Sequence, residues 1–213
     1  MAARTPLSRP RIIEAAAAVA DRSGVEGVSM RTVAKELGVE AMSLYHHLAG
    51  KEQLLDDLAN WVFEQIEDPD PGEGWRPALS ARAHCARAVL GAHPWALRLV
   101  DARRAALPAQ LRHHDATLGC LFVNGFSVEL ATHAVSVTDS YVYGFVLTEK
   151  NLPFQPGEST EHMVDDMELP LEDYPNLARM LGELVVGRDY RYASEFDFGL
   201  DVILDGLARH VGR

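Results

Sequence analysis

The sequence predicts an all-α protein with two modules: an N-terminal three-helix domain with a helix-turn-helix and a C-terminal helical domain. Apolar residues recur at intervals of three and four along nearly every segment, and no segment shows the alternation of a β-strand. Capping residues and glycines divide these segments into separate helices. A turn-rich stretch, EDPDPGEGWRP at residues 67–77, separates residues 1–66 from residues 67–213.

Four helical segments are expected before this break. The first follows Ser8, a good N-cap, and stops near Gly24. Ser29 caps the second segment, which ends after about two turns at Gly38. The third segment covers about residues 41–48, and a fourth follows it directly.

The second and third segments, joined at LGVE, have the proportions of a helix-turn-helix. Helical spacing directs five apolar side chains onto the first segment: Val33, Leu37, Val39, Leu44 and Leu48. The side chains left facing outward include no carboxylate: Met42, Ser43, Tyr45, His46 and His47. Such a surface is suited to the major groove of DNA. A structural alternative remains open, in which Tyr45 packs against the fourth segment and the two histidines are solvated.

Charge is distributed unevenly along the chain. The net charge is −11, yet residues 1–51 contain seven Lys or Arg against five Asp or Glu. A basic surface favours phosphates, whereas the acidic remainder opposes non-specific binding to polyanions. We expect Arg31, Thr32 and Lys51, which flank the outward face, to contact phosphates of double-stranded DNA.

Residues 12–58, IIEAAAAVADRSGVEGVSMRTVAKELGVEAMSLYHHLAGKEQLLDDL, resemble the DNA-binding domain of the tetracycline-repressor (TetR) family of bacterial transcriptional regulators. The LYHHL stretch is similar to the family's recognition helix. The resemblance implies that a set of side chains approaches DNA: Ala41, Met42, Ser43, Tyr45, His46 and Lys51, with Arg31 reaching in from the second segment. Most members of the family are repressors, so the resemblance also implies that this regulator is a repressor.

Helical patterns resume after the break at about residues 78–91, 94–105, 108–124, 127–150, 174–187 and 194–212. Residues 151–172 contain three prolines and six acidic residues but no Lys or Arg, which predicts a mobile acidic loop. The stretch LFVNGFSVELATHAVSVTDSYVYGFVLTEKN, residues 121–151, resembles the regulatory domain of the tetracycline repressor's own subgroup.

The resemblance implies a homodimer that reads a palindromic operator, with the helices at 127–150 and 194–212 forming the interface. The apolar side of the last helix, with Leu200, Ile203, Leu204, Leu207 and Val211, is expected to serve that role. Such stripes are more often intramolecular core, and that alternative stays open.

The family also has a small-molecule effector pocket inside the C-terminal helices, and filling it lowers operator affinity. The candidate lining residues here are Trp95, Arg103, His114, Thr117, Phe122, Val135 and Asp139. A role in the core, or at the surface for Arg103, is the alternative for each of them. Their polar members suit an uncharged, oxygenated apolar molecule.

The positions that bind a tetracycline–magnesium chelate in the tetracycline repressor differ in this chain. The family's pocket His and Thr fall near Val100 and Arg103, or one residue later at Asp101 and Arg104. The His and Asn of the earlier helices correspond to about Glu67 and Arg82. We therefore expect a different effector, of unknown identity.

An enzyme is the main rival class, and the sequence gives it little support. The nine histidines show no H-x-x-x-H spacing, and adjacent pairs such as His113–His114 point about 100° apart on a helix. We expect no catalysis, metal or cofactor. A second rival keeps the DNA-binding module but gives the C-terminal domain only a dimerisation role, or a protein partner at residues 151–172.

The chain contains no run of about 18 apolar residues, so no membrane span is expected. Its two cysteines, Cys85 and Cys120, fit a reducing cytoplasm better than a disulfide framework.

Overall fold

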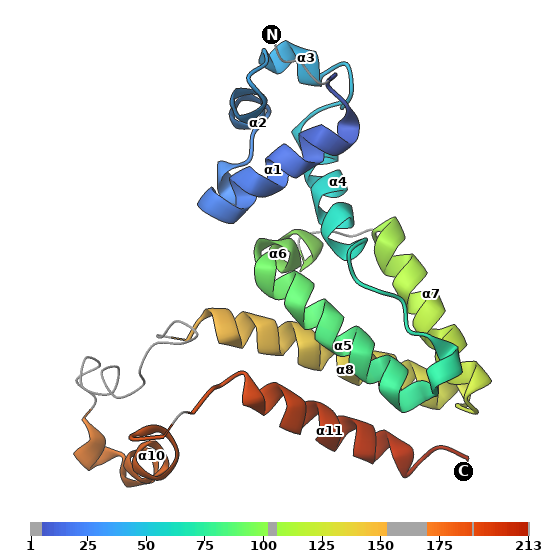
Figure 1. Cartoon of the computed structure of the whole chain (residues 1–213), viewed down its shortest axis with the longest axis vertical. Helices are drawn as coiled ribbons and strands as arrows, with labels where there is room; N and C mark the ends of the chain where they lie inside the picture. The colour runs from blue at the N-terminus through green and yellow to red at the C-terminus, as the bar shows by residue number, and fades with distance from the viewer. Residues whose placement is uncertain (1–5, 102–105, 153–169, 189, 213) are drawn as a thin grey trace.

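The computed structural model describes residues 6–101, 106–152, 170–188 and 190–212 of the chain. These residues form helices and turns with no strand among them, which confirms the all-α prediction. No helix in this part of the chain is both long and apolar enough to cross a membrane. Figure 1 shows α2 and α3 at one end of the molecule and α11 at the other, with α4 running between the two halves.

The N-terminal helices are α1 (Arg9–Ser23), α2 (Met30–Leu37), α3 (Ala41–Leu44) and α4 (Lys51–Phe63), with a 3-10 turn at Val25–Gly27. The C-terminal helices are α5 (Trp75–Ala92), α6 (Trp95–Asp101), α7 (Pro108–Val123), α8 (Val128–Lys150), α10 (Pro175–Met180) and α11 (Ser194–Ala208). A π-helical segment, Leu181–Val185, continues α10, and 3-10 turns lie at Pro71–Glu73 and Leu171–Asp173.

Local capping fixes the ends of α2. The Ser29 hydroxyl accepts a hydrogen bond from the Thr32 amide at 3.1 Å, and the Thr32 hydroxyl accepts one from the Ser29 amide at 2.9 Å. These two bonds satisfy amides that the first turn of a helix leaves without partners. At the other end Gly38 adopts φ 65°, a left-handed conformation that glycine enters without steric cost. The sequence therefore sets the length of this helix at both ends.

The third segment is shorter as a helix than residues 41–48. Regular α-helix stops at Leu44, and turn hydrogen bonds carry the chain onward, including one from the Leu48 amide to the Leu44 carbonyl at 3.0 Å. Leu44 and Leu48 are both buried, so the predicted inward face persists through the turn. The helix α4 contacts α1 on one side and α6 and α7 on the other. It thus belongs physically to both halves of the molecule.

Two expected boundaries shift. The helix α5 already begins at Trp75, inside the predicted break, because the Trp75 ring packs edge-on against Phe126 with centroids 5.1 Å apart. The expected helix 174–187 is divided into α10 and the π-helical segment. Most of the acidic stretch 151–172, and with it the predicted mobility, lies outside the described residues.

The apolar stripe expected to pair two subunits turns out to be intramolecular core. Leu200, Leu204 and Leu207 of α11 are buried within the chain, where α11 packs along α8. The side chains that α11 directs outward are instead Phe198, 70% exposed, and Val202, 57% exposed. The sequence pattern located the amphipathic helix correctly, but most of the face that it offered to a second subunit is buried within the chain.

The position of α11 along α8 is fixed by Tyr141. Its hydroxyl donates to the carbonyls of Glu195 and Phe196, each at 3.0 Å, at the start of α11. The ring of Tyr141 lies so close to Gly199 that a Cβ there would overlap it. Arg87 of α5 adds a further contact, since its guanidinium lies 4.7 Å from the centre of the Phe196 ring. These contacts hold α5, α8 and α11 together.

Candidate nucleic-acid interface and internal cavity

The outward side of α3, together with the turn at residues 45–47 that follows it, carries the side chains that were predicted to face DNA. Met42 is 72% exposed and Tyr45 is 50% exposed, and His46 and His47 are exposed as well. Ala41 and Ser43 are partly exposed on the same short segment. Burial of Leu44 forces this arrangement, because a helix that buries one side must present the other. Contact with DNA remains a prediction for these residues.

Cations around this face differ in how far they are neutralised. Arg9 pairs with Asp57 at 2.6 Å, and Arg22 pairs with Glu36 at 2.6 Å. Arg31, Lys35 and Lys51 are exposed and have no ion-pair partner among the residues that the structure describes. Free cations near a polar face supply the phosphate contacts of a nucleic-acid interface. Lys35 was missed by the sequence analysis, although its position one turn after Arg31 is a usable signal.

Thr32 has a structural role in the helix cap, and the phosphate contact expected of it remains a prediction. Its hydroxyl accepts from the Ser29 amide and lies 2.9 Å from the Gly27 carbonyl, so it is occupied within the helix cap. A hydroxyl engaged in this way stabilises the first turn of α2. The signal was present in the sequence as the Ser29-x-x-Thr32 spacing.

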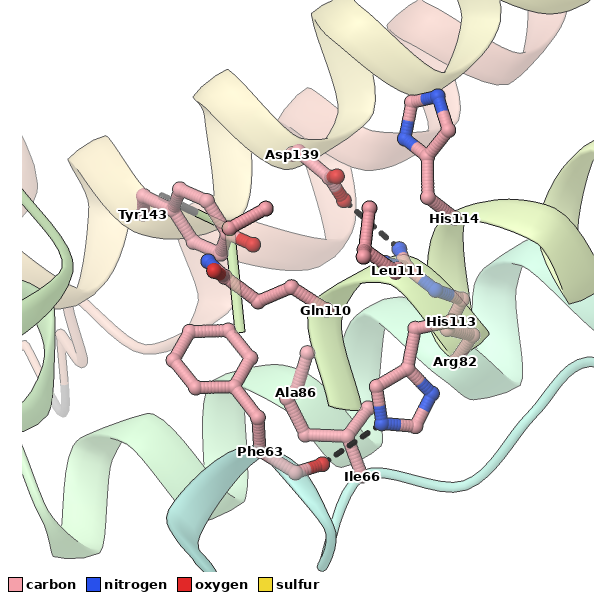
Figure 2. A pocket seen from close by; sticks show the side chains of 11 residues that line it. Phe63, Ile66, Arg82, Ala86, Gln110, Leu111, His113, His114, Asp139 and Tyr143 are labelled. Carbon is pink, nitrogen blue, oxygen red and sulfur yellow. Dashed lines mark hydrogen bonds and ion pairs between the residues drawn. The ribbon is translucent and has the colours of Figure 1, made fainter. Parts of the chain in front are cut away.

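The C-terminal helices and the end of α4 line a partly open cavity of about 270 Å³. Its wall comes from the end of α4 and the residues just after it, from α5, from α7 with the residue Ala106 before it, and from α8 (Figure 2). The apolar part of the wall comprises Phe63, Ile66, Ala86, Ala106 and Leu111. The polar part comprises Arg82, Gln110, His113, His114, Asp139 and Tyr143. Such a mixture of apolar walls and a few polar groups is typical of small-molecule sites.

The charged groups of the wall are paired with each other. Arg82 is only 6% exposed, and its guanidinium donates to Asp139 at 2.8 Å. The Arg82 Nε atom has no hydrogen-bond partner among the described residues. Because a buried ion pair is stable only when both charges are present, neither charge is available to neutralise a charged ligand.

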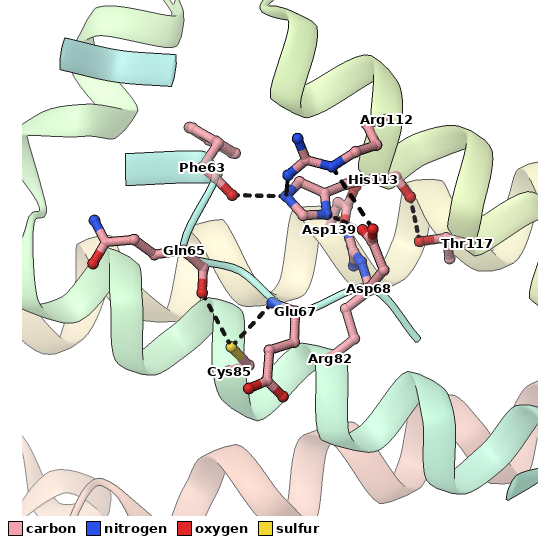
Figure 3. A network of polar contacts seen from close by, with 10 residues as sticks. All are labelled: Phe63, Gln65, Glu67, Asp68, Arg82, Cys85, Arg112, His113, Thr117 and Asp139. Atoms are coloured by element: carbon pink, nitrogen blue, oxygen red, sulfur yellow. Dashed lines mark hydrogen bonds and ion pairs between the residues drawn. The ribbon is translucent and has the colours of Figure 1, made fainter. Parts of the chain in front are cut away.

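His113 joins three parts of the chain behind this wall (Figure 3). Its Nε2 lies 2.7 Å from the carbonyl oxygen of Phe63, the last residue of α4, and its Nδ1 contacts the carboxylate of Asp68. A carbonyl only accepts hydrogen bonds, so Nε2 is the donor. The hydroxyl of Thr117 donates to the His113 carbonyl at 2.6 Å. His113 therefore anchors α7 to the end of α4 and to the connection that follows it.

Besides the Arg82 Nε atom, three polar groups of the wall keep hydrogen-bonding capacity. The Tyr143 hydroxyl and the His114 ring have no hydrogen bond within the described ranges, and Gln110 uses its carbonyl oxygen on the Leu107 amide, which leaves its NH2 group. Burial raises the pKa of the Tyr143 phenol above its ordinary value, with the Asp139 charge adding to the shift. The hydroxyl is therefore a neutral donor at physiological pH.

The predicted effector residues are only partly brought together. His114 and Asp139 line the cavity. Four others lie elsewhere: Trp95 and Val135 are buried in the core, Thr117 bonds its own helix, and Phe122 is exposed at the end of α7. Arg103 lies outside the described residues, as does Arg104. The expectation that Trp95 and Phe122 form the apolar wall is not supported by this geometry.

Several wall residues that the sequence analysis missed lie in segments that were assigned to another domain or to the core. Phe63 and Ile66 belong to a segment assigned to the N-terminal module, so they were not considered for a C-terminal pocket. Tyr143 was not distinguished from the core positions of α8. Arg82 was aligned with a drug-contacting position of the tetracycline repressor but was not counted among the lining residues, although an arginine among the small apolar residues of a helix needs a buried partner.

Comparisons with known proteins place the chain in a family. The description "Bacterial regulatory proteins, tetR family" fits residues 12–58, and "Tetracyclin repressor-like, C-terminal domain" fits residues 68–211. The HTH-type transcriptional repressor DrrR1 of Streptomyces coeruleorubidus is 35% identical over 212 residues, covering 94% of this chain and 77% of the relative. The class D tetracycline repressor protein of Escherichia coli is 28% identical over 209 residues, covering 94% and 89%.

Solved structures agree with this assignment. ActR of Streptomyces coelicolor, a TetR family protein solved in complex with actinorhodin, is 25% identical with a TM-score of 0.72, covering 98% of this chain and 100% of that chain. A possible TetR family regulator of S. coelicolor A3(2) is 28% identical with a TM-score of 0.75, covering 95% and 99%. The chain therefore belongs to the TetR family of bacterial transcriptional regulators.

Proposed function

We propose that this protein is a dimeric repressor that binds a palindromic DNA operator and is released by a small molecule bound in the cavity. One observation carries the proposal: the helix that contributes Phe63 to the cavity wall is the same helix that begins at Lys51 beside the DNA-facing residues. A molecule that fills the cavity therefore acts directly on α4. Effector binding and DNA binding are then thermodynamically linked.

The relatives support this reading. DrrR1 is named a repressor, and ActR was solved with actinorhodin bound. The relatives reported above are named as regulators and repressors, which supports a protein without catalytic activity. Such a function places the chain in the cytoplasm, where the DNA is.

The effector is an uncharged molecule with hydrogen-bond acceptor oxygens. Arg82 and Asp139 neutralise each other, so a charged ligand would gain no counter-ion from them. Tyr143, Gln110 and His114 supply donors around an otherwise apolar space of about 270 Å³. This chemistry fits an oxygenated apolar molecule better than a magnesium chelate.

The dimer forms through the outward faces of α8 and α11. Phe198 and Val202 on α11, with Val137 and Leu147 on α8, are apolar and exposed in the single chain. A second copy that covers them would remove this apolar surface from water. We expect Phe198→Glu to give folded monomers in sedimentation, whereas Leu204→Glu, at a position 1% exposed, should unfold the subunit. A dimer that persists in Phe198→Glu would contradict this interface.

The first experiment is selection from a randomised duplex pool, followed by anisotropy titration of the selected duplex across salt concentrations. A palindromic winner whose affinity falls steeply with salt is expected, because phosphate contacts release counter-ions. The same duplex then serves to screen uncharged oxygenated compounds for release of the protein. Weak binding to every duplex would overturn the proposal, and tight DNA binding with no releasing compound would favour a C-terminal domain that only dimerises or binds a protein.

A further inference from the structure

The N-terminal and C-terminal halves are joined by side chains that converge on one carboxylate. Asp21 lies in the last turns of α1. Its Oδ1 accepts a hydrogen bond from the indole Nε1 of Trp95 at 2.7 Å and lies 2.8 Å from Nδ1 of His93. His93 ends α5 and Trp95 begins α6, so one atom of α1 holds the junction of two C-terminal helices.

This junction is shielded from water and reinforced by α4. Trp95 is 5% exposed, and the His93 side chain is largely buried. The Trp61 ring of α4 packs edge-on against the His93 ring, with centroids 5.4 Å apart. Because the indole nitrogen only donates, it depends on the Asp21 oxygen as its acceptor, and losing that acceptor would leave a buried donor unsatisfied. The nearby Arg98–Glu26 pair is exposed and at 3.5 Å, so it contributes little.

The junction is also connected to the cavity through two continuous helices. The helix α5 carries Arg82 and Ala86 in the cavity wall and ends at His93. The helix α4 carries Phe63 in the wall, two residues after Trp61. A ligand that displaces either helix therefore shifts the rings around Asp21. Since α1 packs against α2, movement of Asp21 reorients the helix-turn-helix.

We propose that Asp21 is the positioning residue that couples the cavity to the DNA-facing helices, through its hydrogen bonds to Trp95 and His93. The inference rests on the proposed function, because it concerns how the cavity and the operator influence each other. Coupling between two sites is reciprocal, so an effector that weakens DNA binding must itself bind the DNA-bound protein more weakly by the same factor, and DNA binding must therefore change the state of the cavity region. Operator DNA alone can thus test it.

The test is amide hydrogen exchange of the full-length protein, with and without a saturating amount of the selected operator duplex. In the wild type we expect the duplex to slow exchange in the second half of α5, near residues 86–93, at least about fivefold, the lower end of typical allosteric coupling. Asp21→Ala should lose this slowing while still binding the duplex. Asp21→Asn should retain it, because the amide oxygen still accepts from the Trp95 indole.

Two further variants separate coupling from general damage. Trp95→Phe keeps the ring but removes the donor, and should behave like Asp21→Ala. Trp75→Phe is the matched control, because Trp75 packs against Phe126 far from Asp21 along the chain, and it should retain the slowing. The inference would be overturned if exchange slowed equally in the wild type, Asp21→Ala and Trp95→Phe. It would also be overturned if a wild type that binds the duplex showed no slowing in α5. Failure of the wild type to bind any duplex would instead overturn the proposed function.

Discussion

The DNA-facing helices and the cavity use polar side chains in opposite ways. On α3 and its flanks, Tyr45, Arg31 and Lys51 point to solvent and have no ion-pair or hydrogen-bond partner in the described part of the chain. Around the cavity, Arg82 and His113 are buried and bonded across helices. The first region keeps its hydrogen-bonding groups for a partner, whereas the second uses most of them to hold its own walls. Substitutions should therefore separate binding from stability in the first region and combine them in the second.

The largest expected difference is between two arginines. Arg82→Met leaves Asp139 without its partner in a largely buried place, and we expect the free energy of unfolding to fall by about 3 kcal/mol. Arg31→Met removes an exposed cation, and the change should stay within about 0.5 kcal/mol. Denaturant unfolding of both variants measures the difference. Equal losses would contradict the distinction between the two regions.

The next effect is a loss of DNA affinity that leaves the stability of the protein unchanged. The double variant Tyr45→Ala, Lys51→Ala removes a candidate base contact and a candidate phosphate contact from each subunit. We expect operator affinity to fall at least about a hundredfold and the slope of log affinity against log salt to decrease by about 2, one for each lost Lys51. The melting temperature and the dimer should be unchanged. Wild-type affinity for the selected duplex would show that the DNA-facing side of α3 has been assigned wrongly.

The smallest effect is a pH dependence in the cavity wall. Burial raises the pKa of Tyr143 in the folded chain above the value of about 10 for an unfolded tyrosine. Both states are protonated below that pH, so Tyr143 changes nothing there. Above it the unfolded state loses its proton first, and stability falls by up to about 1.4 kcal/mol per pH unit.

Tyr143→Phe should make the alkaline fall in stability less steep by the contribution of one proton, which is up to about 1.4 kcal/mol per pH unit. It should not abolish the slope, because burial also raises the pKa of Tyr141 and Tyr190. Tyr174→Phe, at an exposed position, is the matched control and should leave the slope as it is. Unfolding curves between pH 9 and 11, a range set around the ordinary tyrosine pKa of about 10, measure the difference. An unchanged slope in Tyr143→Phe would mean that this hydroxyl is hydrated.

The same contrast explains what the sequence could predict. Caps such as Ser29 and left-handed stops such as Gly38 are local, so the helices of the N-terminal half were predicted in order and nearly in length. The exposed set on α3 follows from helical spacing once Leu44 is known to be buried. The exposed position of Thr32 did not reveal that its hydroxyl is engaged in the cap.

The cavity could not be predicted in the same way, because its contacts join residues far apart in the chain. Arg82 meets Asp139 across 57 positions, and His113 meets Phe63 across 50. Periodicity shows that a helix has an apolar side but not which neighbour covers it. For that reason the side of α11 marked by Leu204 was predicted to contact a second subunit, although it is buried within the chain, and the exposed apolar side marked by Phe198 was not considered.

The close contact between Tyr141 and Gly199 has a consequence for how such a regulator could change its target. In the proposed dimer, the azimuth of α11 sets where Phe198 points, and hence the angle between the two subunits and the distance between their half-sites. Any side chain larger than hydrogen at Gly199 would overlap Tyr141, so the Tyr141 ring or α11 would have to move, and a movement of α11 would turn that outward face. We therefore expect related proteins that bind operators with a different half-site spacing to differ at residues 141 and 199 together. A change at residue 199 alone would alter the half-site spacing that the dimer fits, and it would affect binding to every operator of the protein at the same time.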